Sequence, residues 1–218
     1  MNAAEKHIKR ALELNPNSAE AHTFYAHLLS NTGRHAEALF EIKLARELDP
    51  LFPFANALEG LFLIHAGQTD EALATVQKTV ELEPNFWMPY LFASSAYIKK
   101  EMYAEAVAEA HRARKLSPVQ TTAISFDGYA LAKSGRCDEA RVALNELLKL
   151  STGRFVPPYH IALVYHGLGE QDETFAWLER GFQQRDPKMT FLKVEPKWNN
   201  LRSEPRFIAL IKQMNFEK

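Results

Sequence analysis

The feature that most constrains this 218-residue chain is a set of prolines at one fixed spacing. They are Pro16, Pro50, Pro84 and Pro118, so the step is 34 residues each time. Each follows a similar phrase, such as Leu12-Glu-Leu-Asn-Pro16 and Arg46-Glu-Leu-Asp-Pro50. An internal repeat of this length predicts a stack of similar units, because one unit alone cannot bury its apolar side.

Other columns of residues share this phase when the repeats are started at Ala19, Pro53, Trp87, Thr121 and Phe155. The eighth residue of each repeat is small: Ala26, Gly60, Ser94, Gly128 and Ala162. The fifteenth residues are Gly33, Gly67, Glu101, Gly135 and Gly169, and the twentieth are Ala38, Ala72, Ala106, Ala140 and Thr174. We expect the small residues where two antiparallel helices cross. We expect the glycine to end the first helix in a left-handed conformation, and the proline to stop the second helix.

The pattern resembles the tetratricopeptide repeat family from residue 3 to about residue 187. The resemblance implies an all-α solenoid, a right-handed superhelix of helix-turn-helix units whose first helices line a concave face. The aromatic residue usual at the fourth place of the first helix occurs only as Tyr90. The other repeats carry His22, Asn56, Ile124 and Pro158 there. The fifth repeat departs most from the pattern, with Thr174, Gly181 and an Asp186-Pro187 ending.

We predict a single domain over residues 1–218, with five full repeats at 19–52, 53–86, 87–120, 121–154 and 155–188. The expected helix pairs are 19–32/35–48, 53–66/69–82, 87–100/103–116, 121–134/137–150 and 155–168/171–184. Residues 3–16 match a second helix alone, with Ala4, Ile8 and Ala11 in the columns of Ala38, Ile42 and Ala45. Two interpretations of this half repeat stay open. Either the chain is a fragment of a longer protein, or the bare helix pairs with a second copy in a homodimer.

Residues 189–218 leave the repeat pattern and are expected to cap the solenoid. We expect Ser203 to be the N-cap of a last helix at about 204–214, with Pro205 in its first turn. That helix would present Phe207, Leu210, Ile211 and Met214 on one face. The phrase from Pro196 to Leu210 resembles the tail after such repeats in bacterial winged-helix regulators, serine/threonine kinases and nucleotide cyclases. This resemblance implies the C-terminal module of a larger regulatory protein.

Composition limits the classes of partner. The formal net charge of −1 argues against a nucleic-acid surface, which needs an excess of basic residues to neutralise phosphates. No run approaches the ~18 apolar residues of a membrane span. The lone Cys137 excludes an internal disulfide. We therefore expect a cytoplasmic protein that has neither nucleic acid nor a membrane as its partner.

The sequence carries no recognisable catalytic motif, because it lacks the phosphate-binding loops, the His-Glu-x-x-His metal motif and the Gly-x-Ser-x-Gly nucleophile turn. An enzyme or metal site would have to lie around Tyr159, His160 and His166. However, the spacing of six between the two histidines does not place them on one helix face. We expect no enzyme, no cofactor and no bound metal, and a protein-protein interaction scaffold instead.

The family resemblance places a peptide-binding groove on the inner side of the first helices. The candidate groove residues are His27, Leu61, Ile64, Met88, Leu91, Ser95, Lys99, Tyr129, Lys133, Tyr159 and Leu163. In some relatives, lysine, asparagine and arginine at the fifth and ninth places of the first helices hold a terminal carboxylate, and those places carry none of these residues here. The apolar and aromatic character of the candidate residues predicts that the groove binds an amphipathic helix or an extended apolar segment of a protein or peptide. The alternative, that these side chains pack on neighbouring helices or on the C-terminal tail, stays open.

Overall fold

The computed structural model describes residues 2–214, which form twelve α-helices, two 3-10 helices and no strand. The α-helices are α1 (Asn2–Leu14), α2 (Ala19–Asn31), α3 (His35–Leu48), α4 (Pro53–His65), α5 (Thr69–Leu82), α6 (Met88–Lys99), α7 (Tyr103–Leu116), α8 (Thr121–Lys133), α9 (Cys137–Leu150), α10 (Pro158–Leu168), α11 (Gln171–Gln183) and α12 (Pro205–Gln213). The 3-10 helices, η1 (Pro187–Lys193) and η2 (Pro196–Leu201), lie between α11 and α12 in the chain.

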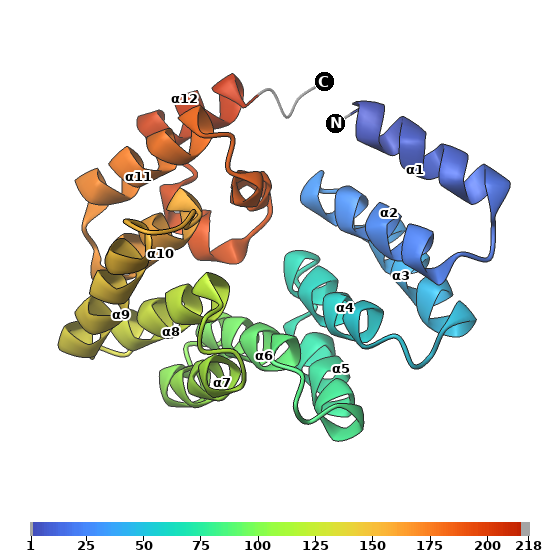
Figure 1. Ribbon diagram of the computed structural model, residues 1–218, viewed down its shortest axis with the longest axis horizontal. Coiled ribbons are helices and arrows are strands. Elements are labelled where there is room, and N and C mark those ends of the chain that lie inside the picture. The colour runs from blue at the N-terminus through green and yellow to red at the C-terminus, as the bar shows by residue number, and fades with distance from the viewer. Residues whose placement is uncertain (1, 215–218) are drawn as a thin grey trace.

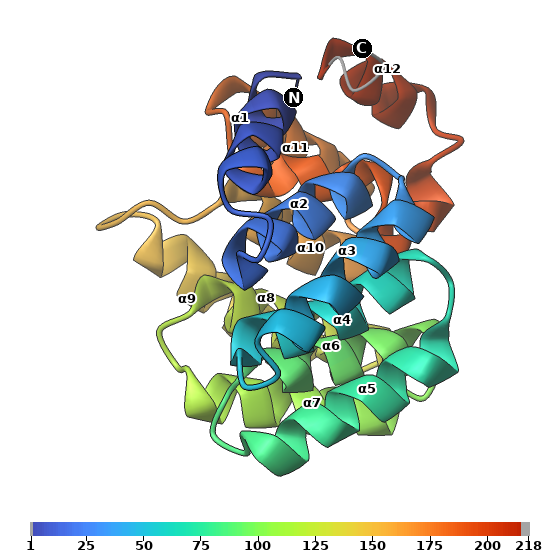
Figure 2. The same cartoon turned by 90° about the vertical axis from the view of Figure 1, so that its right-hand side faces the viewer.

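The helices form a single curved stack, with α2, α4, α6, α8 and α10 on the inside and α3, α5, α7, α9 and α11 on the outside (Figure 1). Figure 2 shows the same stack from the side, with neighbouring pairs layered on one another. The all-α solenoid expected from the 34-residue period is confirmed. The largest shift of a helix boundary is at α10, which begins at Pro158 and not at 155. Pro157 is extended, and a proline at the first helical position is well suited to start a helix.

A left-handed residue ends the first helix of every repeat. Gly33, Gly67, Gly135 and Gly169 have φ angles of 84°, 87°, 83° and 78°. Glu101 occupies the same place in the third repeat and adopts φ 59°. Because a side chain is unfavourable in this conformation by about 1–2 kcal/mol, Glu101 is a point of backbone strain in an otherwise regular column.

Small residues lie where paired helices cross, as the eighth column predicts. Ala26, Ser94 and Ala162 are fully buried. At Gly60, a β-carbon would overlap the Cγ1 atom of Val76 on the partner helix α5. The spacing between the helices of a pair therefore leaves no room for a larger side chain in this column.

The fourth place of the first helix, where the sequence shows no common residue type, has a common contact. His22 Nε2 lies 2.9 Å from the carbonyl oxygen of Pro16, and Asn56 Nδ2 lies 2.9 Å from that of Pro50. The hydroxyl of Tyr90 donates to the carbonyl of Pro84 at 2.8 Å. Three different side chains thus satisfy the carbonyl of the proline that ends the preceding repeat.

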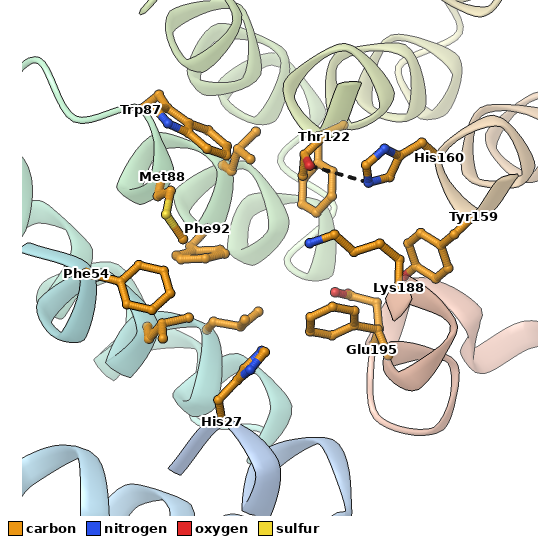
Figure 3. Close-up of a pocket in the computed structure, with 15 residues that line it drawn as sticks. His27, Phe54, Trp87, Met88, Phe92, Thr122, Tyr159, His160, Lys188 and Glu195 are labelled. Atoms are coloured by element: carbon orange, nitrogen blue, oxygen red, sulfur yellow. Dashed lines mark hydrogen bonds between the residues drawn. The ribbon is translucent and has the colours of Figure 1, made fainter. Parts of the chain in front are cut away.

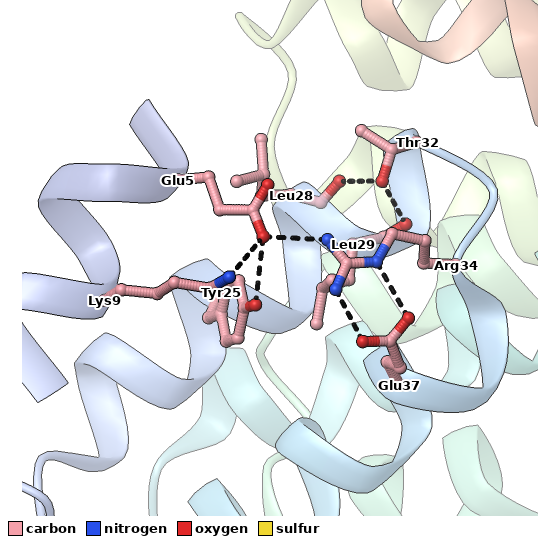
Figure 4. Close-up of polar contacts among 8 residues, drawn as sticks. All are labelled: Glu5, Lys9, Tyr25, Leu28, Leu29, Thr32, Arg34 and Glu37. Atoms are coloured by element: carbon pink, nitrogen blue, oxygen red, sulfur yellow. Dashed lines mark hydrogen bonds and ion pairs between the residues drawn. The ribbon is translucent and has the colours of Figure 1, made fainter. Parts of the chain in front are cut away.

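The N-terminal helix α1 is joined to the stack through one carboxylate (Figure 4). Glu5 Oε1 accepts hydrogen bonds from Arg34 at 2.8 Å and from the Tyr25 hydroxyl at 3.1 Å, and it lies 3.0 Å from Lys9 Nζ. The hydrogen bond from Arg34, with that from Lys9, lowers the pKa of Glu5 to about 2. These contacts keep α1 in the orientation of a second helix of a repeat.

The apolar contacts of α1 are incomplete compared with those of α3. Ile8 and Leu12 pack against Tyr25, Leu29 and Ala38 but stay half-exposed. Ala4 and Ala11 are exposed, whereas Ala38 and Ala45, their counterparts in α3, are fully buried. One apolar side of α1 is therefore uncovered by residues 2–214.

At the other end, α12 packs on α11 through buried Phe207 and Leu210, with Ile211 and Met214 half-buried. The expectation that Ser203 caps this helix is wrong. The N-cap is Glu204, with φ −70° and ψ 131°, and its side chain makes no capping hydrogen bond. The residue before a proline is driven toward extended backbone, so Pro205 fixes the start of the helix one residue later.

Candidate binding site on the concave face

The segment Pro187–Leu201, which we call the tail, lies inside the curve of the stack (Figure 1). Met189, Leu192, Trp198 and Leu201 of the tail are buried, two of them completely. The concave face is therefore not an open groove along its whole length. Part of it is closed by the chain itself.

The unusual features of the fifth repeat make this arrangement possible. A β-carbon at Gly181 would lie 2.8 Å from the sulfur of Met189, so a larger residue would require the Met189 side chain to shift. The Asp186 carboxylate accepts hydrogen bonds from the backbone N–H of Lys188 at 2.8 Å and of Tyr159 at 3.0 Å. It thereby caps η1 and joins it to the first turn of α10.

Lys197, which is paired with Glu195 inside the tail, joins the tail to α6 and α8. Lys197 Nζ lies 3.0 Å from Glu195 Oε1, donates to the Ser95 hydroxyl at 2.7 Å and sits 4.2 Å from the centre of the Phe126 ring. Burial by itself would raise the pKa of Glu195, but Lys197 and the other partners more than offset it, so the pKa lies below its ordinary value. The carboxylate is therefore ionised and compensated within the tail.

Trp198 is the largest fully buried side chain of the tail and contacts α10 directly. Its indole N–H donates to the Tyr159 hydroxyl at 2.9 Å, and its ring stacks on His166 at 4.9 Å. His166 stacks on Tyr129 at 5.9 Å, and burial raises the pKa of Tyr129 well above its ordinary value. The candidate groove residues Ser95 and Tyr159 thus contact the tail, and Tyr129 packs on His166 behind it.

The tail leaves a cleft of about 150 Å³ open on the concave face (Figure 3). It is lined by His27, Phe54, Leu58, Leu61, Trp87, Met88, Leu91, Phe92, Thr122, Phe126, Tyr159, His160, Lys188, Phe191 and Glu195. Five candidate groove residues meet here, namely His27, Leu61, Met88, Leu91 and Tyr159. Phe54 and Trp87, at the starts of helices, were not among the candidate groove residues. The alternative that groove side chains pack on the C-terminal tail holds for Ser95 and Tyr159.

One cation projects into the cleft. The Lys188 side chain points inward (Figure 3), with Nζ 5.4 Å from the centre of the Phe191 ring. Burial lowers the pKa of Lys188, and no carboxylate of residues 2–214 lies within 4.0 Å of its ammonium group. Burial, with Lys188 as a smaller cause, lowers the pKa of His27 to about 4 and that of His160 to about 3. Both imidazoles are neutral at pH 7, so the charged groups that line the cleft are Lys188 and Glu195, and Glu195 is paired with Lys197.

Two further candidate residues, Ile64 and Lys99, line a separate recess of about 410 Å³, which we call the cationic recess. Its other lining residues are His35, His65, Lys193, Val194, Pro196, Asn199 and Arg202. Of the remaining candidates, Leu163 is fully buried in the core and Lys133 is exposed at the end of α8. The predicted groove residues are therefore divided among the cleft, the recess, the contact with the tail and the core.

The two histidines considered for chemistry have separate partners. His160 Nδ1 lies 2.9 Å from the Thr121 hydroxyl, and His166 Nε2 lies 2.9 Å from the carbonyl oxygen of Lys197. Within residues 2–214, no three His, Cys, Asp or Glu side chains are placed to hold a metal ion together. Cys137 is exposed at the start of α9. In the same part of the chain, every helix is too short or too polar to span a bilayer.

Comparison with known proteins identifies the repeat. Residues 1–61 match a tetratricopeptide repeat family. By sequence, no curated protein matches the chain.

Three solved structures share the fold. TTC0263 of Thermus thermophilus, a thermophilic TPR protein, is 20% identical with a TM-score of 0.65, over 89% of this chain and 100% of that one. A chain of the APC/C hetero-tetramer Cut9-Hcn1 is 13% identical with a TM-score of 0.66, over 99% of this chain and 43% of the other. YrrB, described as a TPR protein with an unusual peptide-binding site, is 21% identical with a TM-score of 0.50, over 87% of this chain and 98% of that one. Residues 1–61 thus match a tetratricopeptide repeat family, and the described chain shares the solenoid fold of solved tetratricopeptide repeat proteins.

Proposed function

We propose that the protein is a non-enzymatic scaffold that binds a segment of a partner protein in the cleft beside the tail. The observation that carries the proposal is a cleft with apolar walls and one inward-pointing cation that lacks a carboxylate partner among residues 2–214. Few convergent polar groups in an apolar pocket are typical of a binding site. The peptide-binding site in the description of YrrB is in line with this use of the fold.

The size and charge of the cleft define the partner segment. A volume of about 150 Å³ holds one aromatic ring or one large aliphatic side chain. Lys188 favours an acidic side chain next to that anchor, because a partly desolvated ammonium group gains most from an ionised acceptor. Phe54 and Trp87 are half-buried and would lose their remaining exposure to a bound helix or extended segment.

Selection from a random peptide library on the purified full chain tests the proposal. We expect the selected peptides to share an aromatic or large aliphatic residue with Asp or Glu nearby. Trp87→Ala should weaken their binding at least about tenfold, because aromatic residues carry much of the affinity at such sites. Phe155→Ala is the matched control, since Phe155 is 62% exposed and does not line the cleft. Equal losses in both variants, or no selected motif, would contradict the proposal.

Self-association is a second candidate, favoured by the uncovered side of α1. Ala4, Ala11 and Leu14 are exposed there, and Phe24 of α2 is 48% exposed. If the homodimer forms through this side, the substitution Ala11→Glu places a charge in its apolar contact. Light scattering should then show a dimer at about 100 μM that Ala11→Glu converts to a monomer. A wild-type monomer at that concentration rejects this candidate.

A regulatory setting is a separate proposal and rests on the resemblance of residues Pro196–Leu210 to the tails of bacterial regulators. In this fold those residues include Trp198 and Leu201, which fill the concave face. The genomic reading frame tests it. A frame that continues upstream into a kinase, cyclase or winged-helix domain supports the proposal, and a stop codon directly upstream contradicts it.

A further inference from the structure

The cationic recess is distinct from the cleft, because the two share no lining residue. It lies where the ends of α4 and α6 and the start of α3 meet the tail. Its volume of about 410 Å³ is large enough for a small polar ligand. The proposed peptide-binding function does not use it.

The charge of the recess is one-sided. Lys99, Lys193 and Arg202 line it, and no acidic residue is among its lining residues. None of these three cations forms an ion pair with a carboxylate of residues 2–214. Because the whole chain has a net charge of −1, this excess is a local feature and not a property of the entire surface.

Two imidazole nitrogens of the recess lack hydrogen-bond partners among residues 2–214. They are Nδ1 of His35 and Nε2 of His65, and both atoms are buried. The Ser30 hydroxyl lies 2.8 Å from His65 Nδ1. When the hydroxyl donates to that nitrogen, the ring hydrogen is on Nε2, which becomes a donor. Such a buried, unpaired donor in a native protein calls for a partner.

The nearby carboxylate of Glu195 does not fill this role. Glu195 Oε2 lies 4.0 Å from His65 Nε2, which is beyond hydrogen-bond distance. The other oxygen of that carboxylate already lies 3.0 Å from Lys197 Nζ, so the charge is compensated. The recess therefore keeps three cations and up to two imidazole donors, with Asn199 contributing an amide at its exposed rim.

We propose that the cationic recess binds a phosphoryl oxyanion, either as a free phosphate compound or as a phosphorylated side chain. Lys and Arg bind phosphate through charge-assisted hydrogen bonds, and neutral imidazole N–H groups can complete the set of donors. A single carboxylate would neutralise only one of the three cations. Phosphate, with up to two negative charges and several acceptor oxygens, matches the recess better.

Titration of the full chain with inorganic phosphate tests this site. We expect phosphate to shift the NMR signals of the His35 and His65 rings, and acetate at the same ionic strength to bind at least about fivefold more weakly. Lys99→Met and Arg202→Gln should each weaken phosphate binding about tenfold. Both side chains are exposed, so the variants should fold. Lys149→Met on the outer helix α9 is the matched control and should bind phosphate as the wild type does.

Two probes separate the sources of the phosphoryl group. Tighter binding of pyrophosphate than of phosphate supports a free phosphate compound, and tighter binding of phosphoserine supports a phosphorylated partner. The proposal is overturned if phosphate does not bind at tens of millimolar, or if Lys99→Met and Arg202→Gln bind it like Lys149→Met. Trp87→Ala should leave phosphate binding unchanged, which keeps this site separable from the cleft.

Discussion

The two irregular ends of this solenoid are attached in different ways. The N-terminal helix α1 is held by a partly exposed carboxylate, Glu5, and by side chains that stay half-exposed. The C-terminal tail is held by fully buried Leu192 and Trp198 and by buried Lys197, which donates to Ser95 of α6. An end held by apolar burial belongs to the cooperative core, whereas an end held by surface ion pairs can open locally. One terminal segment thus lines the proposed cleft, and the other lies at the open end of the stack.

The largest expected effect is on the tail. Trp198→Ala should lower the free energy of unfolding by about 3–5 kcal/mol, because it leaves a cavity beneath Tyr159 and His166. Urea unfolding followed by far-UV circular dichroism measures the change. Leu14→Ala is the counterpart at the other end and should cost no more than about 0.5 kcal/mol, since Leu14 is 70% exposed. Similar losses for the two variants would abolish the contrast between the ends.

Acid should weaken the concave side before it weakens α1. Burial lowers the pKa of His27 and of His65 to about 4 and that of His160 to about 3, from an ordinary value of 6.5. As the pH falls below 6.5, the unfolded chain takes up protons that the folded chain does not. The free energy of unfolding should then fall by up to about 1.4 kcal/mol per pH unit for each of these residues.

Glu5 loses its stabilising effect in a lower pH range than the histidines do. Its pKa is lowered from 4.5 to about 2, so its stabilising effect is complete above 4.5 and is lost as the pH falls toward 2. Urea midpoints at pH 7.5 and pH 5.5 therefore report on the imidazoles and not on Glu5. His160→Gln should reduce the difference between the two midpoints. Equal wild-type midpoints would show that the imidazoles are not excluded from water.

A smaller effect is expected from Glu5→Gln, which removes the charge shared by Arg34, Lys9 and Tyr25. Because the Glu5 carboxylate is partly exposed, the free energy of unfolding should fall by about 1 kcal/mol or less. Hydrogen exchange should accelerate in α1 and stay unchanged in the tail. Faster exchange in η2 as well would mean that the two ends are coupled through the stack.

The smallest change is expected at the strained residue in the middle of the stack. Glu101→Gly restores the glycine of the repeat column at φ 59° and should stabilise the protein by about 0.5 kcal/mol. Thermal unfolding gives the sign of the effect. A destabilised variant would mean that a contact of the Glu101 side chain outweighs the backbone strain.

The fold could be predicted from the sequence because its signals are local and repeat every 34 residues. The glycine column and the small eighth residues correspond directly to left-handed turns and close helix crossings. The shared contact of His22, Asn56 and Tyr90 with a proline carbonyl was hidden, because three different side chains supply one interaction. A list of residue types cannot show this common role.

The candidate site was less predictable, because the tail breaks the repeat and packs far from its place in the sequence. Lys197 bonds Ser95, which lies 102 positions earlier in the chain. Gly181 and Asp186-Pro187 were recognised as departures from the pattern, but what they permit is visible only when η1 lies against α11 and α10. The groove was therefore inferred along the whole concave face, although the tail covers part of it.

Native-state hydrogen exchange at the tail tests the central claim most directly, namely that the tail is part of the core that shapes the cleft. Within the tail, the backbone N–H of Glu195 donates to the carbonyl oxygen of Phe191 at 2.8 Å. The backbone N–H of Trp198 donates to the carbonyl oxygen of Glu195 at 3.2 Å. We predict that they exchange only with global unfolding, at the same opening free energy as amides in the middle of α8 and α10. Exchange as fast as that of α1 would show that the tail leaves the concave face readily, and would contradict the account.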